Sequence, residues 1–124
     1  MKRLPKKRTT KHLHADPRIV GAWFKQHGLP VPVAEYRIDP SRRFRWDWAW
    51  PDHCVALECQ GGIWNGGAHG RGWGIKRDME KSNIAACHGW LTLSCEPKEL
   101  MTVETVAMVR TCIQQNIFGR VNLF

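Results

Sequence analysis

The clearest alternation of apolar and polar residues lies in the tryptophan-rich middle of the chain. Residues 44–50 predict a strand, because the side chains of a strand point alternately to its two faces. The alternation puts Phe44, Trp46, Trp48 and Trp50 on one face and Arg45, Asp47 and Ala49 on the other. Residues 55–60 predict a second strand that presents Glu58 and Gln60 on one face. The short connection between the two strands favours an antiparallel hairpin.

Helical spacing and capping residues predict three helices. Asp16 and Pro17 form an N-cap followed by a first helical position, and Gly28 is a natural C-cap. A second helix is predicted for residues 75–88 and a third after Thr102. The expected buried side of the second helix consists of Ile75, Met79, Ala86 and Cys87.

Further short strands are predicted for residues 34–38 and 90–95, which gives the order α-β-β-β-α-β-α. This order predicts an α/β (α+β) fold with a central mixed β-sheet flanked by helices. A chain of 124 residues suits one domain. We expect residues 16–124 to form that domain and residues 1–15 to form a flexible basic arm.

The charge of the chain points to a partner that carries phosphate. The formal net charge is +8, and Lys or Arg fills six of the first eleven positions. Such a balance is typical of proteins that bind nucleic acid, although a solubilising surface would also account for the N-terminal residues. The sequence has neither the ~20 consecutive apolar residues of a membrane span nor the apolar stretch of a secretory signal. We therefore expect a cytoplasmic protein that does not enter membranes.

The five cysteines form no CxxC pair. A disulfide framework is not indicated, and reduced, buried thiols are the expectation. The spacing of His53, Cys54, Cys87 and His88 matches no known closed zinc site.

Two acids, Asp47 and Glu58, interrupt the most apolar stretches of the chain. A hairpin register that brings them side by side would place their carboxylates a few Å apart, where they repel unless a cation lies between them. Mg²⁺ takes one or two carboxylates and keeps several waters. The pattern therefore predicts a magnesium site. The alternative is a pair of solvent-facing acids that bind Arg43 or Arg45.

These residues also carry a resemblance to a known family. Asp47, followed eleven residues later by Glu58-Cys59-Gln60, resembles the D…(D/E)-x-K signature of the PD-(D/E)XK nuclease superfamily. The ordered set RRFRWDWAWP, VALECQGGIW, H-x-R-G, D-M-E-K-x-N-x-A and GW most resembles small phage and prophage endonuclease-like proteins of that superfamily. It is more distantly similar to the very-short-patch-repair endonucleases. The resemblance covers residues 35–95, about half of the chain.

The resemblance implies a restriction-endonuclease-like core and metal-dependent hydrolysis of phosphodiester bonds in DNA. Asp47 and Glu58 would then bind Mg²⁺, or Mn²⁺ in its place, and the backbone carbonyl of Cys59 would supply a further ligand. An upstream acid is a ligand in some relatives, so Glu35 is either an additional ligand or a solvated turn residue.

Gln60 takes the place of the lysine that orients or activates water, and glutamine supplies no positive charge to a transition state. Some members of the superfamily take that lysine from a nearby helix, which makes Lys81 the natural candidate and Lys76 the second. The alternative for Lys81 is an ordinary exposed helix residue paired with Asp78 or Glu80.

The glycine-rich stretch 61–74 adds candidates for substrate binding. His69 would protonate the leaving 3′ oxygen or bind phosphate, although a loop histidine often has no such role. Trp64 and Trp73 would stack on unpaired bases or pack over the edge of the sheet. The residues expected to bind nucleic acid are Arg43, Arg45, Arg71, Lys76, Arg77, Trp64 and Trp73.

The sequence thus favours a Mg²⁺-dependent endodeoxyribonuclease that acts on structured or branched DNA, or on nicked or mismatched duplex. Phage origin and the cytoplasm of a bacterial or phage-infected cell follow from the resemblance alone. Junction resolvases of the superfamily act as dimers, and a short protomer suits a homodimer. Two alternatives are a non-catalytic DNA-binding protein on a degenerate nuclease scaffold, and a small structural protein whose charge is incidental.

Overall fold

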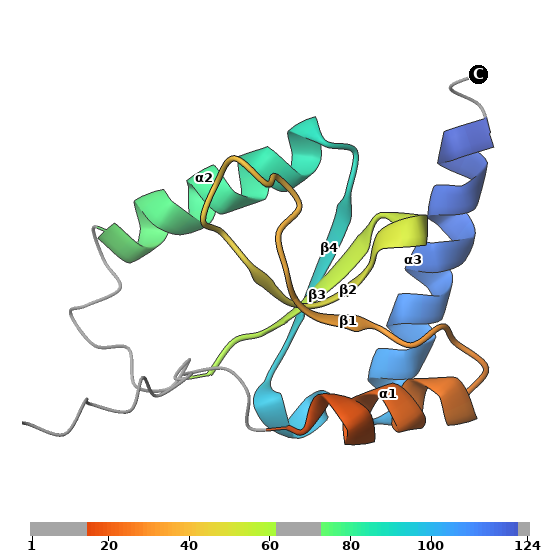
Figure 1. Cartoon of the computed structure of the whole chain (residues 1–124). Coiled ribbons are helices and arrows are strands. Elements are labelled where there is room, and N and C mark those ends of the chain that lie inside the picture. The colour runs from red at the N-terminus through yellow and green to blue at the C-terminus, as the bar shows by residue number, and fades with distance from the viewer. Residues whose placement is uncertain (1–14, 62–72, 122–124) are drawn as a thin grey trace, which may run out of the picture.

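The computed structural model describes residues 15–61 and 73–121, whose elements follow the predicted order (Figure 1). The basic arm expected for residues 1–15 therefore lies outside the description except for its last residue. Among the described residues, no helix combines the length and the apolar content needed to cross a membrane. The helices and strands are α1 (Pro17–Gln26), β1 (Val33–Tyr36), β2 (Trp46–Trp50), β3 (Val55–Cys59), α2 (Trp73–Cys87), β4 (Leu91–Cys95) and α3 (Val103–Val121).

The four strands form one mixed sheet in the order β1-β2-β3-β4. The predicted hairpin is confirmed: β2 and β3 are antiparallel, and Trp48 and Leu57 are Cα partners. Strand β1 pairs antiparallel with β2, whereas β4 pairs parallel with β3. A parallel neighbour requires a crossover, and α2 lies in that connection. The protein is thus an α+β fold with a four-stranded mixed sheet.

Helices cover both faces of the sheet, with α1 and α3 on one side and α2 on the other (Figure 1). The larger core, on the α1 and α3 side, contains Phe24, Trp48, Trp50 and Val109. Phe24 and Trp50 meet edge to face with ring centroids 5.0 Å apart. The smaller core, on the α2 side, contains Ala56 and Ala85. The sheet is therefore the middle layer of the molecule.

The capping signals predicted for α1 are present. The Asp16 side chain accepts a hydrogen bond from the Arg18 N–H at 2.9 Å, and Pro17 opens the helix. Gly28 has a φ of +78°, a conformation that glycine adopts without the strain other residues incur. Thr102 likewise accepts a hydrogen bond from the Thr105 N–H ahead of α3.

The prediction that all four aromatic residues of 44–50 share one face is wrong. Trp48 and Trp50 belong to the core under α1 and α3, but Trp46 belongs to the core under α2, against which Phe44 packs. The regular alternation breaks beside Glu35, which has a φ of +50° on the neighbouring strand β1. Left-handed backbone is not extended, so the pairing of β1 with β2 is locally distorted where the alternation breaks.

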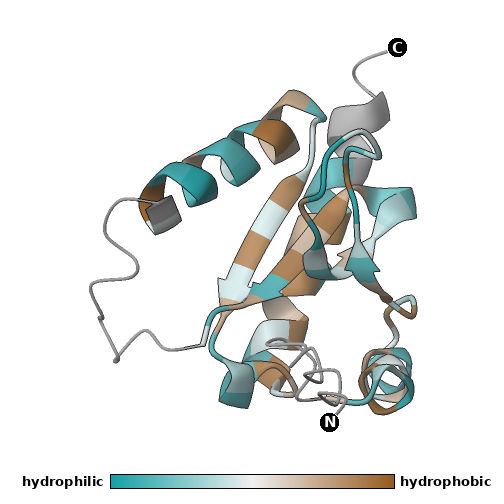
Figure 2. Ribbon diagram, turned by 60° about the vertical axis from the view of Figure 1, so that its left-hand side comes forward, coloured by the Kyte–Doolittle hydropathy of each residue, from teal (hydrophilic) through white to brown (hydrophobic). Residues whose placement is uncertain are grey.

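The predicted buried side of α2 is also wrong. Ile75 and Met79 are 54% and 61% exposed, and the helix buries Ala85 instead. Figure 2 shows α2, at the upper left, as a largely hydrophilic helix above an apolar sheet. The apolar spacing failed as a guide because a lysine, Lys81, takes an inward position where it has charged and aromatic partners.

Candidate metal and phosphate site

Asp47 is the buried acid of the hairpin. It lies in β2 with 6% of its surface exposed, and its Oδ2 accepts a hydrogen bond of 2.7 Å from the Cys59 N–H of β3. One step beyond the pair formed by Trp48 and Leu57, the same register would set Asp47 opposite Glu58. The carboxylate therefore ties β2 to the end of β3 at the residue that follows Glu58.

The strand on the other side of Asp47 is locally distorted. In the pairing of β1 with β2, Ala34 faces Trp48 and Tyr36 faces Trp46. Glu35, which stands between those partners, has left-handed backbone with a φ of +50°. Residues other than glycine rarely adopt this conformation, and such strain is concentrated at functional sites.

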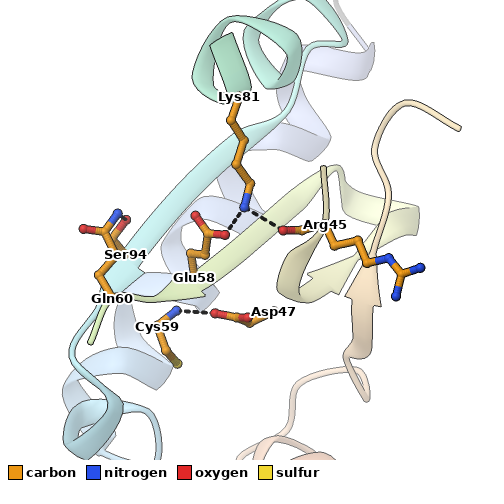
Figure 3. Close-up of polar contacts among 7 residues, drawn as sticks. All are labelled: Arg45, Asp47, Glu58, Cys59, Gln60, Lys81 and Ser94. Atoms are coloured by element: carbon orange, nitrogen blue, oxygen red, sulfur yellow. Dashed lines mark hydrogen bonds and ion pairs between the residues drawn. The ribbon is translucent and has the colours of Figure 1, made fainter. Parts of the chain in front are cut away.

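Glu58 forms an ion pair with Lys81, which reaches down from α2 (Figure 3). The Lys81 ammonium also donates a hydrogen bond of 2.6 Å to the Arg45 carbonyl oxygen. It lies 4.7 Å from the centroid of the Trp46 ring, within range of a cation–π interaction. Both charged side chains are largely buried, with exposures of 16% for Lys81 and 25% for Glu58.

Burial raises the pKa of Glu58 above the usual value for a glutamic acid. The Lys81 ammonium opposes this effect, and the carboxylates of Asp47 and Asp78 add to it. Glu58 thus gains stability as an anion from any further positive charge in its surroundings.

The two acids open into a common cleft of about 490 Å³. Glu35 also reaches this cleft, where it forms an ion pair of 3.5 Å with Arg45. The other residues that line it are Arg43, Phe44, Cys59, Gln60, Gly61, Arg77, Asp78 and Lys81. The lining thus combines four acids with three arginines and one lysine, so both signs of charge meet in the same cleft.

Gln60 lies beside the acids, as the sequence predicted, but its amide is held elsewhere. The Nε2 group donates a hydrogen bond of 3.3 Å to Ser94 Oγ on β4. Figure 3 shows this amide beside Ser94, away from Asp47. Gln60 carries no charge in any case, so the positive charge beside Glu58 comes from the ammonium of Lys81.

The structure decides between the alternatives for several predicted residues. Lys81 does not pair with Asp78 or Glu80 as an exposed helix lysine would; it pairs with Glu58, while Glu80 pairs with Arg42. Lys76 is exposed on α2 and is not among the residues that line the cleft.

Four of the predicted residues fall wholly or in their side chains outside the described structure. Trp64, His69 and Arg71 lie outside the described residues, as does the side chain of Trp73.

Two residues that line the cleft, and one that contacts Lys81 beside it, were missed as site residues by the sequence prediction. Asp78 precedes Lys81 by one helical turn and so shares its face, a spacing that could have identified it. The Phe44 ring lies under the guanidinium of Arg77, 5.9 Å from ring centroid to Cζ. Trp46 could not have been found, because alternation pointed it to the other face.

The donor atoms of the cleft fit a magnesium ion. The residues that the structure describes contain no group of three or more His, Cys, Asp or Glu side chains arranged to hold a metal. Mg²⁺ needs no such cage, because it binds through one or two carboxylates and keeps water in its other positions. Asp47 and Glu58, with the main chain at Cys59 beside them, supply hard oxygen ligands of this kind.

Comparison with known proteins found no matching family model, no matching curated protein and no matching solved structure.

Proposed function

We propose that the protein is a metal-dependent endodeoxyribonuclease with a restriction-endonuclease-like core, which hydrolyses phosphodiester bonds in structured or branched DNA. The observation that supports this most is the arrangement around Glu58. Two acids from neighbouring strands line one cleft, and a largely buried ammonium from α2 contacts one of them. A carboxylate pair with an adjacent cation is the arrangement that hydrolysis of a phosphodiester uses.

In this proposal Asp47 and Glu58 bind Mg²⁺, or Mn²⁺, and the Cys59 carbonyl is a further ligand. When bound, the ion polarises a phosphoryl oxygen and lowers the pKa of a coordinated water. Glu58 supports this role because its raised pKa makes the carboxylate gain from a nearby cation. The Cys59 N–H supports it as well, since it fixes one oxygen of Asp47.

Lys81 supplies the positive charge that Gln60 lacks. Its ammonium is oriented by the Arg45 carbonyl and by the Trp46 ring, so it stands at the floor of the cleft without having to be ordered by the substrate. A fixed cation at this place stabilises the negative charge that develops on a phosphate during in-line attack. Arg43 and Arg77 on the cleft walls bind neighbouring phosphates.

A second candidate function is non-catalytic DNA binding, and the same ion pair favours it. The Lys81 ammonium already neutralises Glu58 and could stand where a metal would otherwise be needed. Gln60 is directed to Ser94 rather than to a water between the acids. In this alternative the acids and Lys81 stabilise the fold, and the arginines bind DNA without cleavage.

The two functions separate in one experiment on the full chain. Supercoiled plasmid and a four-way junction are incubated with Mg²⁺ or Mn²⁺, using wild type, Asp47→Asn, and Lys25→Gln on the distant helix α1 as a control. If the protein is a nuclease, the wild type should cleave the DNA, and a metal chelator should stop the cleavage. The cleavage rate of Asp47→Asn should fall below about a hundredth of the wild-type rate, whereas the rate of Lys25→Gln should be unchanged.

Binding by gel shift is measured in parallel. DNA binding that survives in all three proteins without cleavage by any of them would establish the second candidate. Absence of both binding and cleavage in the wild type would exclude the two candidates together and leave a structural role.

A further inference from the structure

A pair of cysteine thiols lies on the opposite side of β3 from Glu58. Cys59 and Cys95 are Cα partners in the parallel pairing of β3 with β4, so their side chains share one face of the sheet. Their Sγ atoms are 3.8 Å apart, and both are free thiols. Cys95 belongs to the larger core, and Cys59 packs against it.

The backbone around this pair suits a disulfide. Paired strands run about 4.8 Å apart, which is within the Cα separation of roughly 4.4–6.8 Å that disulfides span. The sulfurs need to approach to about 2.05 Å, which side-chain rotation and a small strand shift allow. The Gln60 N–H donates a hydrogen bond of 2.8 Å to the Cys95 carbonyl, and the Gln60 side chain bonds Ser94. These contacts hold the sulfurs as neighbours.

The two thiols differ in access to solvent. Cys95 is buried, with 7% of its surface exposed, whereas Cys59 is half-buried. A small oxidant therefore reaches the sulfur of Cys59 more readily than that of Cys95. Cys95, held beside it in the core, is then the nearest group able to react with an oxidised sulfur.

We propose that Cys59 and Cys95 form a redox-modification site, which a hydroperoxide converts to a reversible disulfide. Hydrogen peroxide transfers one oxygen to the Cys59 sulfur, which gives a sulfenic acid and one water. The Cys95 sulfur then attacks that sulfur: the S–S bond forms, the S–O bond breaks, and the hydroxyl leaves as a second water with the Cys95 proton. The two thiols lose two electrons in all, and a dithiol reductant reverses the reaction by exchange.

Disulfide formation would also change the positions of the acids in the cleft. Cys59 directly follows Glu58, and its N–H is the group that fixes Asp47. Drawing Cys59 toward β4 therefore changes the relative position of the two carboxylates. If they bind metal as proposed above, oxidation weakens Mn²⁺ binding by about tenfold, and reduction restores it. The disulfide itself does not rest on the proposed function.

The test maps the cysteines of the folded, full-length protein after treatment with hydrogen peroxide. Free thiols are blocked with iodoacetamide, and the protein is digested without reductant and examined by mass spectrometry. Chymotrypsin is suitable because cleavage after Leu57 and after Trp90 separates Cys59 from Cys54 and Cys95 from Cys87. We expect one linked peptide pair, Cys59 with Cys95, that disappears after dithiothreitol.

Two variants sharpen the result. Cys95→Ser should lose the linked pair and leave a sulfenic acid on Cys59 that dimedone traps, whereas Cys87→Ser, which changes an exposed cysteine of α2, should keep the link. Two results with the wild type alone would overturn the proposal. In one, peroxide leaves both thiols open to alkylation; in the other, it joins Cys59 equally to other cysteines. A reduced protein that binds no Mn²⁺ would instead count against the metal site alone.

Discussion

At the scale of single residues, Lys81 is the side chain that makes the most contacts to other residues of the site and that balances the charge of Glu58. Its ammonium has a carboxylate, a carbonyl oxygen and an indole ring as neighbours, and only 16% of the side chain is exposed. A lysine so placed has lost most of its water, and Glu58 compensates for that loss. The same interaction keeps Glu58 charged against the burial that raises its pKa.

Replacement of Lys81 by methionine should destabilise the fold by about 1–3 kcal/mol at pH 7, because it leaves Glu58 as a buried, unpaired charge. The value lies below that of a fully buried pair because water still reaches both side chains. Urea unfolding measures the effect, and Lys76→Met, on the exposed face of the same helix, is the control. A loss that is equally large at pH 4, where Glu58 is protonated, would contradict this explanation.

The raised pKa of Glu58 also predicts how stability depends on pH. Between the ordinary value of 4.5 and the higher pKa in the fold, the folded state binds this proton more tightly than the unfolded state does. The contribution of Glu58 to stability therefore falls as pH rises through that interval and is constant above it. Urea unfolding at a series of pH values should show a steeper decline for wild type than for Glu58→Gln. Parallel curves would disprove the raised pKa.

At the scale of elements, the distortion of β1 at Glu35 accompanies the turn of Trp46 toward α2. A left-handed conformation costs a residue other than glycine about 1–2 kcal/mol. This strain is offset in the wild type by the ion pair of Glu35 with Arg45 and by the packing of Trp46.

Glu35→Gly should be more stable than Glu35→Ala by about 1 kcal/mol, because both lose the carboxylate but only glycine relieves the backbone strain. Thermal or urea unfolding of the two variants measures the difference directly. Alanine as stable as glycine at this position would mean that the backbone of β1 carries no such strain.

The elements also show what the sequence could and could not predict. The hairpin that carries both acids followed from alternation and a short turn, and α1 followed from its caps, because these signals are local. The inward face of α2 did not follow, because Lys81 is placed there by Glu58, a partner remote in sequence. The face of Trp46 was missed for the same kind of reason, since it packs with Ala56 and Ala85, which lie on other elements.

The candidate site was predictable in part. The pairing of Asp47 with Glu58 was expected from two acids in apolar strands, and both line one cleft. Lys81 came from the resemblance to nucleases, since no spacing within the chain connects it to the hairpin. Asp78 and Phe44 were missed because a charged helix residue and a strand aromatic are common without any site.

At the scale of the whole molecule, positive charge exceeds negative charge by eight, yet acids collect at the cleft floor. Arginines surround this floor, and Arg42 ties the segment before β2 to α2 through Glu80. Under the proposed function, we expect the molecule as a whole to attract DNA, which would meet the acids only within the cleft and would need a cation there for close approach.

Binding to a fluorescent four-way junction should therefore weaken as salt increases. Replacement of Arg77 on the cleft wall by glutamine should reduce the slope of log K against log salt by about 1, because one phosphate contact is lost. Lys25→Gln removes the same charge from α1 and should leave the slope unchanged. Equal slopes for wild type and Arg77→Gln would place the phosphate contacts outside the cleft.

The parallel pairing of β3 with β4 sets the order in which parts of the site can form while the chain is being synthesised. The hairpin with Asp47 and Glu58 can form as soon as it leaves the ribosome, since it is local in the chain. The crossover helix, and Lys81 with it, is anchored only after the strand that ends at Cys95 has emerged and aligned. A nascent chain thus exposes Glu58 before it acquires the counter-charge of Lys81, and any cleavage activity would begin only after the strand that ends at Cys95 has paired with β3.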